Sequence, residues 1–346
     1  MTAPTSRLRG AGGARRFVSR AVKAVRYRSS RQFAYLDLGR TSASTLLVTG
    51  TVRSGTTWLA EQVLNHDNRY RMIFEPLNKW RSPVAIPGLT WAKYLAPDDD
   101  AVEWRAALEA VVTGRIRSAW TDRANERRIS RRRIIKCVSA TNLLPWFWQR
   151  HPDMRTIHIV RHPFAVADSV CRLIDKSEQS PWPRQVADVD DVLAHAGLLD
   201  GPLLSQRDSI LDLRQQCNSS FTLMVLRWCL ENVVALREQW RSPNHHVLHY
   251  EDLVRGPAAE LRRLEHALGP GSVPDPSTLA RPSRTDFHKR VGTTRSQPGH
   301  EQELIARWEA SIPLAEQQLG LSILETFGLD HVYGADPLPK AAPVPP

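Results

Sequence analysis

Short apolar segments rich in β-branched residues alternate along the chain with longer segments of helical periodicity. The apolar segments predict strands at Thr45–Thr49, Arg71–Phe74, Arg133–Val138, Thr156–Val160 and Val247–Tyr250. The apolar spacing also predicts helices over Phe221–Trp240 and Ala258–Leu268. Strands that alternate with helices favour a parallel sheet covered on both faces. The pattern therefore predicts an α/β fold, a single domain with a central parallel sheet flanked by helices.

Two segments interrupt this alternation. Ser82–Arg132 is irregular and then charged, and Ser177–Gln216 begins with a Ser/Pro/Trp-containing run before it turns acidic. Insertions of this kind usually lie near a ligand-binding mouth. We therefore expect helical insertions outside the sheet. The domain is predicted over residues 41–335, after a basic, partly disordered N-terminal arm over 1–40 and before a disordered Pro-rich tail over 336–346.

The positive charge of the chain is concentrated in the arm. The net charge is +11, and nine cationic residues precede the first acidic residue, Asp37, which leaves +2 for the remainder. A basic body that wraps nucleic acid is therefore disfavoured. Two interpretations of the arm stay open: a solvated leader, or an amphipathic segment that lies peripherally on an anionic membrane with Phe17, Val18 and Val22 on its apolar face.

Neither a membrane-spanning run nor a secretion signal is evident in the sequence, which predicts a cytoplasmic location. The four cysteines show no pairing or metal-ligand spacing, as is typical of buried thiols in a reducing compartment. We expect no metal ion.

Small residues join the first predicted strand to the following helix in an order that is typical of an anion site. The loop runs from Gly50 to Gly55 with the spacing of a nucleotide-triphosphate loop, but Thr56 stands where that loop has lysine. The cation comes earlier, at Arg53. Backbone N–H groups at a helix start bind phosphate-like groups, so the loop is predicted to hold one without the apparatus for a γ-phosphate.

A second candidate anion site follows the strand Thr156–Val160. Arg161 ends the strand, Pro163 starts a helix, and Ser169 lies on that helix. A guanidinium and a hydroxyl can bind one phosphate together.

Together these motifs resemble those of the sulfotransferases that use 3′-phosphoadenosine-5′-phosphosulfate (PAPS). Arg53–Trp58 resembles their 5′-phosphosulfate loop, and Arg161–Ser169 is similar to their 3′-phosphate motif. Tyr250–Leu253 resembles the strand end and helix after the second site. The resemblance covers roughly residues 44–333 and is closest in motif style to bacterial and carbohydrate sulfotransferases. It implies a P-loop nucleotide-kinase-like fold.

The resemblance also implies roles for individual residues. The 5′-phosphosulfate would be held by Arg53, Ser54, Gly55, Thr56 and Thr57, and the adenine would stack against Trp58. The 3′-phosphate would be bound by Arg161 and Ser169. Arg53 would also stabilise the charge that grows on the bridging oxygen. For a third contact to the 3′-phosphate the candidates are Lys289–Gly292 and Arg281–Arg284, and neither matches the family well.

The acceptor hydroxyl must lose a proton, so the reaction needs a base. Many small-molecule sulfotransferases have a histidine after the strand that here reads Ile134–Ser139, and this chain has none there. Ile73–Asn78 resembles instead the Glu-Pro-Leu segment of carbohydrate sulfotransferases. Glu75 is therefore the predicted base. Lys136 would either steady the sulfuryl group or pair with a carboxylate.

The predicted function is transfer of a sulfuryl group from PAPS to a hydroxyl of a carbohydrate, a glycolipid or a small metabolite. Tryptophans in or beside the insertions are candidates for stacking on sugar rings: Trp80, Trp91 and Trp182. Two alternatives are a P-loop kinase-like phosphotransferase, disfavoured by Thr56, and a non-enzymatic basic membrane-binding protein, which rests on the arm alone.

Overall fold

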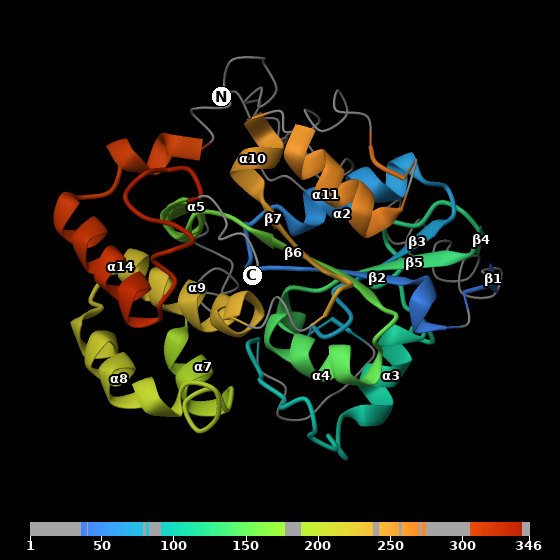
Figure 1. Cartoon of the computed structure of the whole chain (residues 1–346), viewed down its shortest axis with the longest axis horizontal. Coiled ribbons are helices and arrows are strands. Elements are labelled where there is room, and N and C mark those ends of the chain that lie inside the picture. Colours follow the sequence, from blue (N-terminus) through green and yellow to red (C-terminus); the bar gives the residue numbers. More distant parts are fainter. Residues whose placement is uncertain are drawn as a thin grey trace, which may run out of the picture.

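A five-stranded, entirely parallel sheet forms the centre of the molecule (Figure 1). The computed structural model describes residues 36–39, 41–78, 81–82, 91–176, 188–237, 242–255, 258–269, 272–274 and 305–340. Within them the sheet has the order β3-β5-β2-β6-β7. Its strands are β2 (Thr45–Thr49), β3 (Tyr70–Phe74), β5 (Arg132–Lys136), β6 (Arg155–Val160) and β7 (His245–His249). The predicted fold class is confirmed.

The strand predictions are right to within two residues at each end. Two differences reach two residues: β7 begins at His245 rather than Val247, and β5 was predicted to reach Val138, which instead begins the 3₁₀ helix η2 (Val138–Leu143). One small sheet was not predicted. It pairs β1 (Leu36–Asp37) with β4 (Ile129–Ser130), and its strands are too short to carry a periodic pattern.

Two helical layers cover the sheet (Figure 1). On one face, α2 (Thr56–His66), α10 (Tyr250–Arg255) and α11 (Ala258–Leu268) pack on Leu46, Val48 and Ile159. On the other face, α3 (Arg105–Val112) and α4 (Leu144–Arg150) pack on Leu47 and Ile135. Successive residues of β2 thus enter opposite cores, which explains why its three central residues, Leu46–Val48, are all apolar.

A cluster of helices extends the fold beyond β7 (Figure 1). The long helix α9 (Ser220–Arg237) packs against α5 (Pro163–Lys176), α7 (Val189–His195) and α14 (Leu314–Thr326). Trp228 of α9 is fully buried in this cluster. Three further elements complete the cluster: the 3₁₀ helices η3 (Leu204–Gln206) and η6 (Arg307–Ala310) and the helix α8 (Arg207–Gln216).

The strand order reverses direction at the carboxyl edge of the sheet, between β2 and β6. After β2 the chain passes to β3 on one side, whereas after β6 it passes to β7 on the other. The loops that leave β2 and β6 therefore diverge, and ligands of open α/β sheets bind where adjacent loops diverge in this way. The two predicted anion sites follow these two strands.

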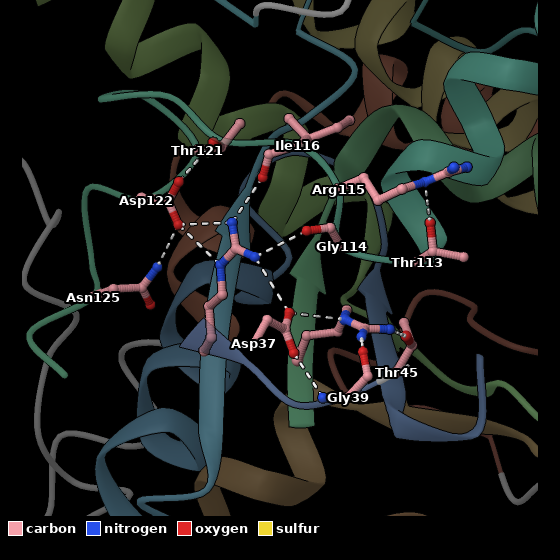
Figure 2. A network of polar contacts seen from close by, with 12 residues as sticks. Asp37, Gly39, Thr45, Thr113, Gly114, Arg115, Ile116, Thr121, Asp122 and Asn125 are labelled. Atoms are coloured by element: carbon pink, nitrogen blue, oxygen red, sulfur yellow. Dashed lines mark hydrogen bonds and ion pairs between the residues drawn. The ribbon is translucent and has the colours of Figure 1, made fainter. Parts of the chain in front are cut away.

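At the opposite edge, a polar network joins β1 to the starts of β3 and β5 (Figure 2). Arg71 and Arg133 face each other in register, and both side chains are fully buried. The Asp37 carboxylate lies 3.3 Å from Arg71 and 3.4 Å from Arg133, and Asp122 lies 2.9 Å from Arg71. Buried guanidinium groups need such partners. Asp37, which the sequence assigned to the arm, is thus bound to the sheet.

The remaining parts of the predicted arm, residues 1–35 and 40, and of the predicted tail, residues 341–346, lie outside the described residues. No helix of the described chain is both long enough and apolar enough to cross a membrane.

Candidate active site

The glycines of the first motif make the loop between β2 and α2 possible. Gly50 has a φ of +145°, and a Cβ there would lie 2.2 Å from the Ile159 carbonyl oxygen. Gly55 has a φ of +96°, and a Cβ there would lie 2.9 Å from the Tyr250 ring. Both conformations suit glycine alone. The loop is therefore pressed against β6 and the end of β7.

The loop presents polar groups that suit an anion. Gly55 occupies the N-cap position of α2, and no side chain caps the first turn. The Ser54 hydroxyl is fully buried and has no hydrogen-bond partner among the residues that the structure describes. An orphaned buried hydroxyl next to an uncapped helix start is costly without a ligand, and an anion would satisfy both. Thr56 and Thr57 occupy the first positions of the same helix.

The structure brings the two predicted anion motifs into direct contact. Arg53 Nε donates a hydrogen bond to Ser169 Oγ at 3.0 Å, and Arg161 Nη1 donates to the Arg53 carbonyl oxygen at 3.2 Å. Arg161 and Ser169 are largely buried. Arg53 itself has a φ of +69°, which is unusual for a residue with a side chain. Two guanidinium groups and a hydroxyl therefore converge where the loops of β2 and β6 diverge.

Aromatic rings extend this cluster. The Trp58 and Tyr250 rings meet edge to face with centroids 5.9 Å apart, and the Arg161 guanidinium lies 4.6 Å from the Tyr250 centroid. Trp58 is 9% exposed. The predicted adenine-stacking residue thus lies one ring away from the predicted 3′-phosphate ligand.

A buried amide supports the loop from behind. Asn232 donates to Thr51 Oγ1 at 2.6 Å and to the Trp228 carbonyl oxygen at 2.6 Å, and its Oδ1 accepts from His158 Nε2 at 2.9 Å. Both polar atoms of this fully buried side chain, Nδ2 and Oδ1, therefore form hydrogen bonds. Asn232 is a positioning residue, and the sequence offered no motif that would have identified it.

A second buried network holds the backbone beside Arg161. Glu251 accepts from the His162 N–H and from the Tyr333 hydroxyl, each at 2.8 Å. The His162 ring accepts from the Phe164 N–H, donates to the Gly334 carbonyl oxygen, and stacks on Trp308 at 4.7 Å. Burial raises the pKa of Glu251. The segment from Trp308 to Gly334 therefore supports the predicted phosphate ligand.

Replacing Tyr333 by phenylalanine tests this support. The exchange leaves a Glu251 oxygen without its donor in a dry interior, so we expect the free energy of unfolding to fall by about 1–3 kcal/mol. Affinity for adenosine 3′,5′-bisphosphate should fall by less than about tenfold, because Arg161 remains. Urea unfolding and calorimetry measure the two effects. Tyr70→Phe, in buried strand β3, is the control, and equal affinity losses in both variants would contradict the assignment.

Buried histidines should make the protein sensitive to acid. Burial lowers the pKa of His158 to about 4, of His162 to about 3 and of His249 to about 4. Below about pH 6.5, these histidines bind protons in the unfolded chain but stay neutral in the folded chain. Each of them therefore lowers the free energy of unfolding by up to about 1.4 kcal/mol per pH unit. Glu260, whose pKa is raised to about 7, acts in the opposite direction. The free energy of unfolding should therefore fall between about pH 6.5 and 4, as urea titrations at several pH values would show; a flat profile would contradict this.

Glu75 lies at the carboxyl end of β3 with a strained backbone. Its φ is +42°, and its side chain is 8% exposed. One carboxylate oxygen pairs with Lys136 Nζ, and the other accepts from the Val138 N–H at 3.2 Å. Of the two roles left open for Lys136, the structure shows pairing with a carboxylate. Strain of this kind tends to persist at functional sites.

Residues from the first insertion border Glu75. Trp120 Nε1 donates to the Glu75 carbonyl oxygen at 3.2 Å, and the Arg123 guanidinium lies 3.4 Å from the Phe74 ring centroid. Burial lowers the pKa of Arg123, and the Glu75 charge opposes that effect. The sequence placed an insertion here but did not identify either side chain.

Other candidates lie elsewhere. Trp91 is buried in the helical cluster. Several predictions fall outside the described residues, namely Trp80, Trp182, Lys289–Gly292 and Arg281–Arg284. Among the residues that the structure describes, no group of three or more His, Cys, Asp or Glu side chains is arranged to hold a metal ion. All four cysteines are free thiols.

Comparison with known proteins adds independent information. A family model described as "Sulfotransferase domain" matches residues 43–277. The chain is similar to the sulfotransferase domain of the Synechococcus PCC 7002 olefin synthase, with 17% identity over 85% of this chain and 96% of that one and a TM-score of 0.43. The sulfotransferase domain from the curacin biosynthetic pathway is 15% identical over 84% and 98% of the chains, with a TM-score of 0.40. Sulfotransferase STF9 from Mycobacterium avium is 12% identical over 90% and 80%, with a TM-score of 0.37. No curated protein matches the chain.

Proposed function

Because this chain belongs to the sulfotransferase domain family, we propose that it transfers a sulfuryl group from PAPS to a hydroxyl of a carbohydrate, glycolipid or small-metabolite acceptor. The observation that carries the proposal is the contact between Arg53, Ser169 and Arg161 at the divergence of the β2 and β6 loops. This contact joins side chains that would bind two different phosphate groups of the donor. They come from motifs that are more than one hundred residues apart.

The two ends of the donor would be bound by different elements. Residues of the β2 loop and the start of α2 would hold the 5′-phosphosulfate: Arg53, Ser54, Gly55, Thr56 and Thr57. Arg161 and Ser169 would bind the 3′-phosphate, and Trp58 would lie against the adenine. The support for this assignment is the buried Ser54 hydroxyl, which lacks a partner.

The acceptor would approach from the β5 and β3 side. The donor loop follows β2 and Glu75 follows β3, and the axes of these two strands are two strand spacings, about 10 Å, apart. Glu75 would take the proton of the acceptor hydroxyl as the hydroxyl oxygen forms a bond to the sulfur of PAPS. The bond from sulfur to the bridging oxygen breaks, and adenosine 3′,5′-bisphosphate leaves with that electron pair. Arg53 would stabilise the charge on the departing oxygen.

Transfer of radiolabelled sulfate from PAPS tests the proposal. The purified chain should bind adenosine 3′,5′-bisphosphate saturably and should label acceptors in a panel of sugars, glycolipids and small hydroxylated metabolites. ATP with magnesium is the control donor, because a kinase would use it. Turnover of ATP without sulfate transfer would refute the proposal.

A further inference from the structure

The small sheet of β1 and β4 has two chemically different faces. In its parallel register Leu36 pairs with Ile129 and Asp37 pairs with Ser130, so each pair shares one face. Asp37 and Ser130 point inward, where Asp37 meets the buried arginines of Figure 2. Leu36 is 53% exposed and Ile129 is 58% exposed. The outer face is therefore aliphatic, and Leu38, 43% exposed, continues it.

Exposed cations flank β4 in the sequence. Arg127 and Arg128 precede Ile129, and Arg131 follows β4; all three are exposed. The exposed acid next to them in sequence is Glu126. We call the set formed by Leu36, Leu38, Ile129, Arg127, Arg128 and Arg131 the ribbon patch.

The chain on the amino-terminal side adds charge of the same sign. Leu36 is separated by four residues from Arg31, the last of the nine cations that precede Asp37. A four-residue spacer spans at most about 17 Å, so the charge of Arg31 stays within that distance of Leu36. Neither the aliphatic side chains nor the positive charges would bind a membrane strongly alone, because stable attachment usually takes an apolar and an electrostatic contribution together.

We propose that the ribbon patch, together with the arm that enters it, binds the surface of an anionic lipid bilayer. The three aliphatic side chains enter the boundary between headgroups and acyl chains, and the arginines contact lipid phosphates. A nucleic acid would use the same charges but has no place for exposed leucine and isoleucine on a ribbon face. The inference goes beyond the proposed function and does not depend on it.

The network of Figure 2 gives this surface a fixed shape. Leu36 N–H donates to the Arg128 carbonyl oxygen at 2.7 Å, and Leu38 N–H donates to the Ser130 carbonyl oxygen at 2.8 Å. Asp37, between the two leucines, is held by Arg71 and Arg133. These arginines begin strands whose opposite ends lead to the candidate active site. A membrane bound here leaves that site open.

Vesicle co-sedimentation of the full chain tests the inference. Vesicles of phosphatidylcholine with phosphatidylglycerol should retain the protein, and pure phosphatidylcholine should not. The double variant Leu36→Asn with Ile129→Asn should bind about tenfold more weakly, which corresponds to about 1.4 kcal/mol. Leu314→Asn is the matched control, since Leu314 is 69% exposed on α14, and its binding should equal that of the parent. Arg128→Gln should weaken binding, whereas Arg207→Gln on α8 should not.

Three outcomes would overturn the inference: no retention by anionic vesicles, equal binding of the double variant and the parent, or binding of RNA without binding of vesicles. Affinity of the same variants for adenosine 3′,5′-bisphosphate provides a separate readout. It should equal that of the parent, because the patch and the donor site lie at opposite edges of the sheet. Failure of vesicle binding therefore leaves the proposed function untouched, and the reverse also holds.

Discussion

Replacing Arg161 by alanine should weaken binding of adenosine 3′,5′-bisphosphate by roughly 30- to 1,000-fold. A charge-assisted, two-pronged contact between guanidinium and phosphate contributes about 2–4 kcal/mol when it is largely shielded from water. Arg161 is 7% exposed, so its contact would be shielded. The variant also loses the hydrogen bond to the Arg53 carbonyl oxygen and the contact with the Tyr250 ring. Isothermal titration calorimetry measures the affinity.

Two further variants serve as controls for this experiment. Arg161→Lys keeps the charge but removes the planar fork, and it should recover only part of the lost affinity. Arg207→Ala removes a half-exposed guanidinium that pairs with Asp200 on the far side of the helical cluster, and it should bind normally. Affinity that is unchanged in Arg161→Ala would place the 3′-phosphate elsewhere and would remove the basis of the donor assignment.

Local patterns were sufficient to predict the sheet and the loop motifs. The strand before Gly50 is buried at every position and has an apolar centre, Leu46–Val48, because both faces of the sheet are covered, and such strands are visible in sequence. The contact of Arg53 with Ser169 could be expected once the fold class was known, because β2 and β6 are neighbours in this strand order. Their motifs lie at the carboxyl ends of those strands.

The supporting residues could not be predicted in the same way. Glu251 and Tyr333 are 82 positions apart, and only the packing of the last helical segment brings them together. The Tyr250–Leu253 run was recognised as a motif, but the sequence assigned no role to its glutamate. Backbone strain is equally invisible in sequence. Three non-glycine residues in the described chain have positive φ, and two of them are Arg53 and Glu75, the predicted catalytic residues.

Replacing Glu75 by glutamine should remove turnover and leave donor binding intact. A positioned general base contributes about 10²–10⁴-fold to a rate, so kcat should fall within that range. The amide has nearly the same shape as the carboxylate and keeps an oxygen for the Val138 N–H, but it cannot accept a proton. It also leaves Lys136 without its buried counter-charge, which costs stability. Sulfate-transfer rates per folded molecule, with affinity for adenosine 3′,5′-bisphosphate from calorimetry, separate these effects.

Glu260→Gln is the matched control, because Glu260 is also a buried carboxylate with a basic partner, Arg263, but lies on α11 away from the candidate site. It should keep its turnover. Lys136→Met distinguishes a base from an ion pair that only holds the strand ends together. If the pair is merely structural, Lys136→Met and Glu75→Gln should reduce stability and turnover in parallel. If Glu75 takes the proton, Glu75→Gln should lose far more turnover at equal stability, and its rate should lose the acidic limb of the pH profile. Normal turnover of Glu75→Gln would exclude Glu75 as the base.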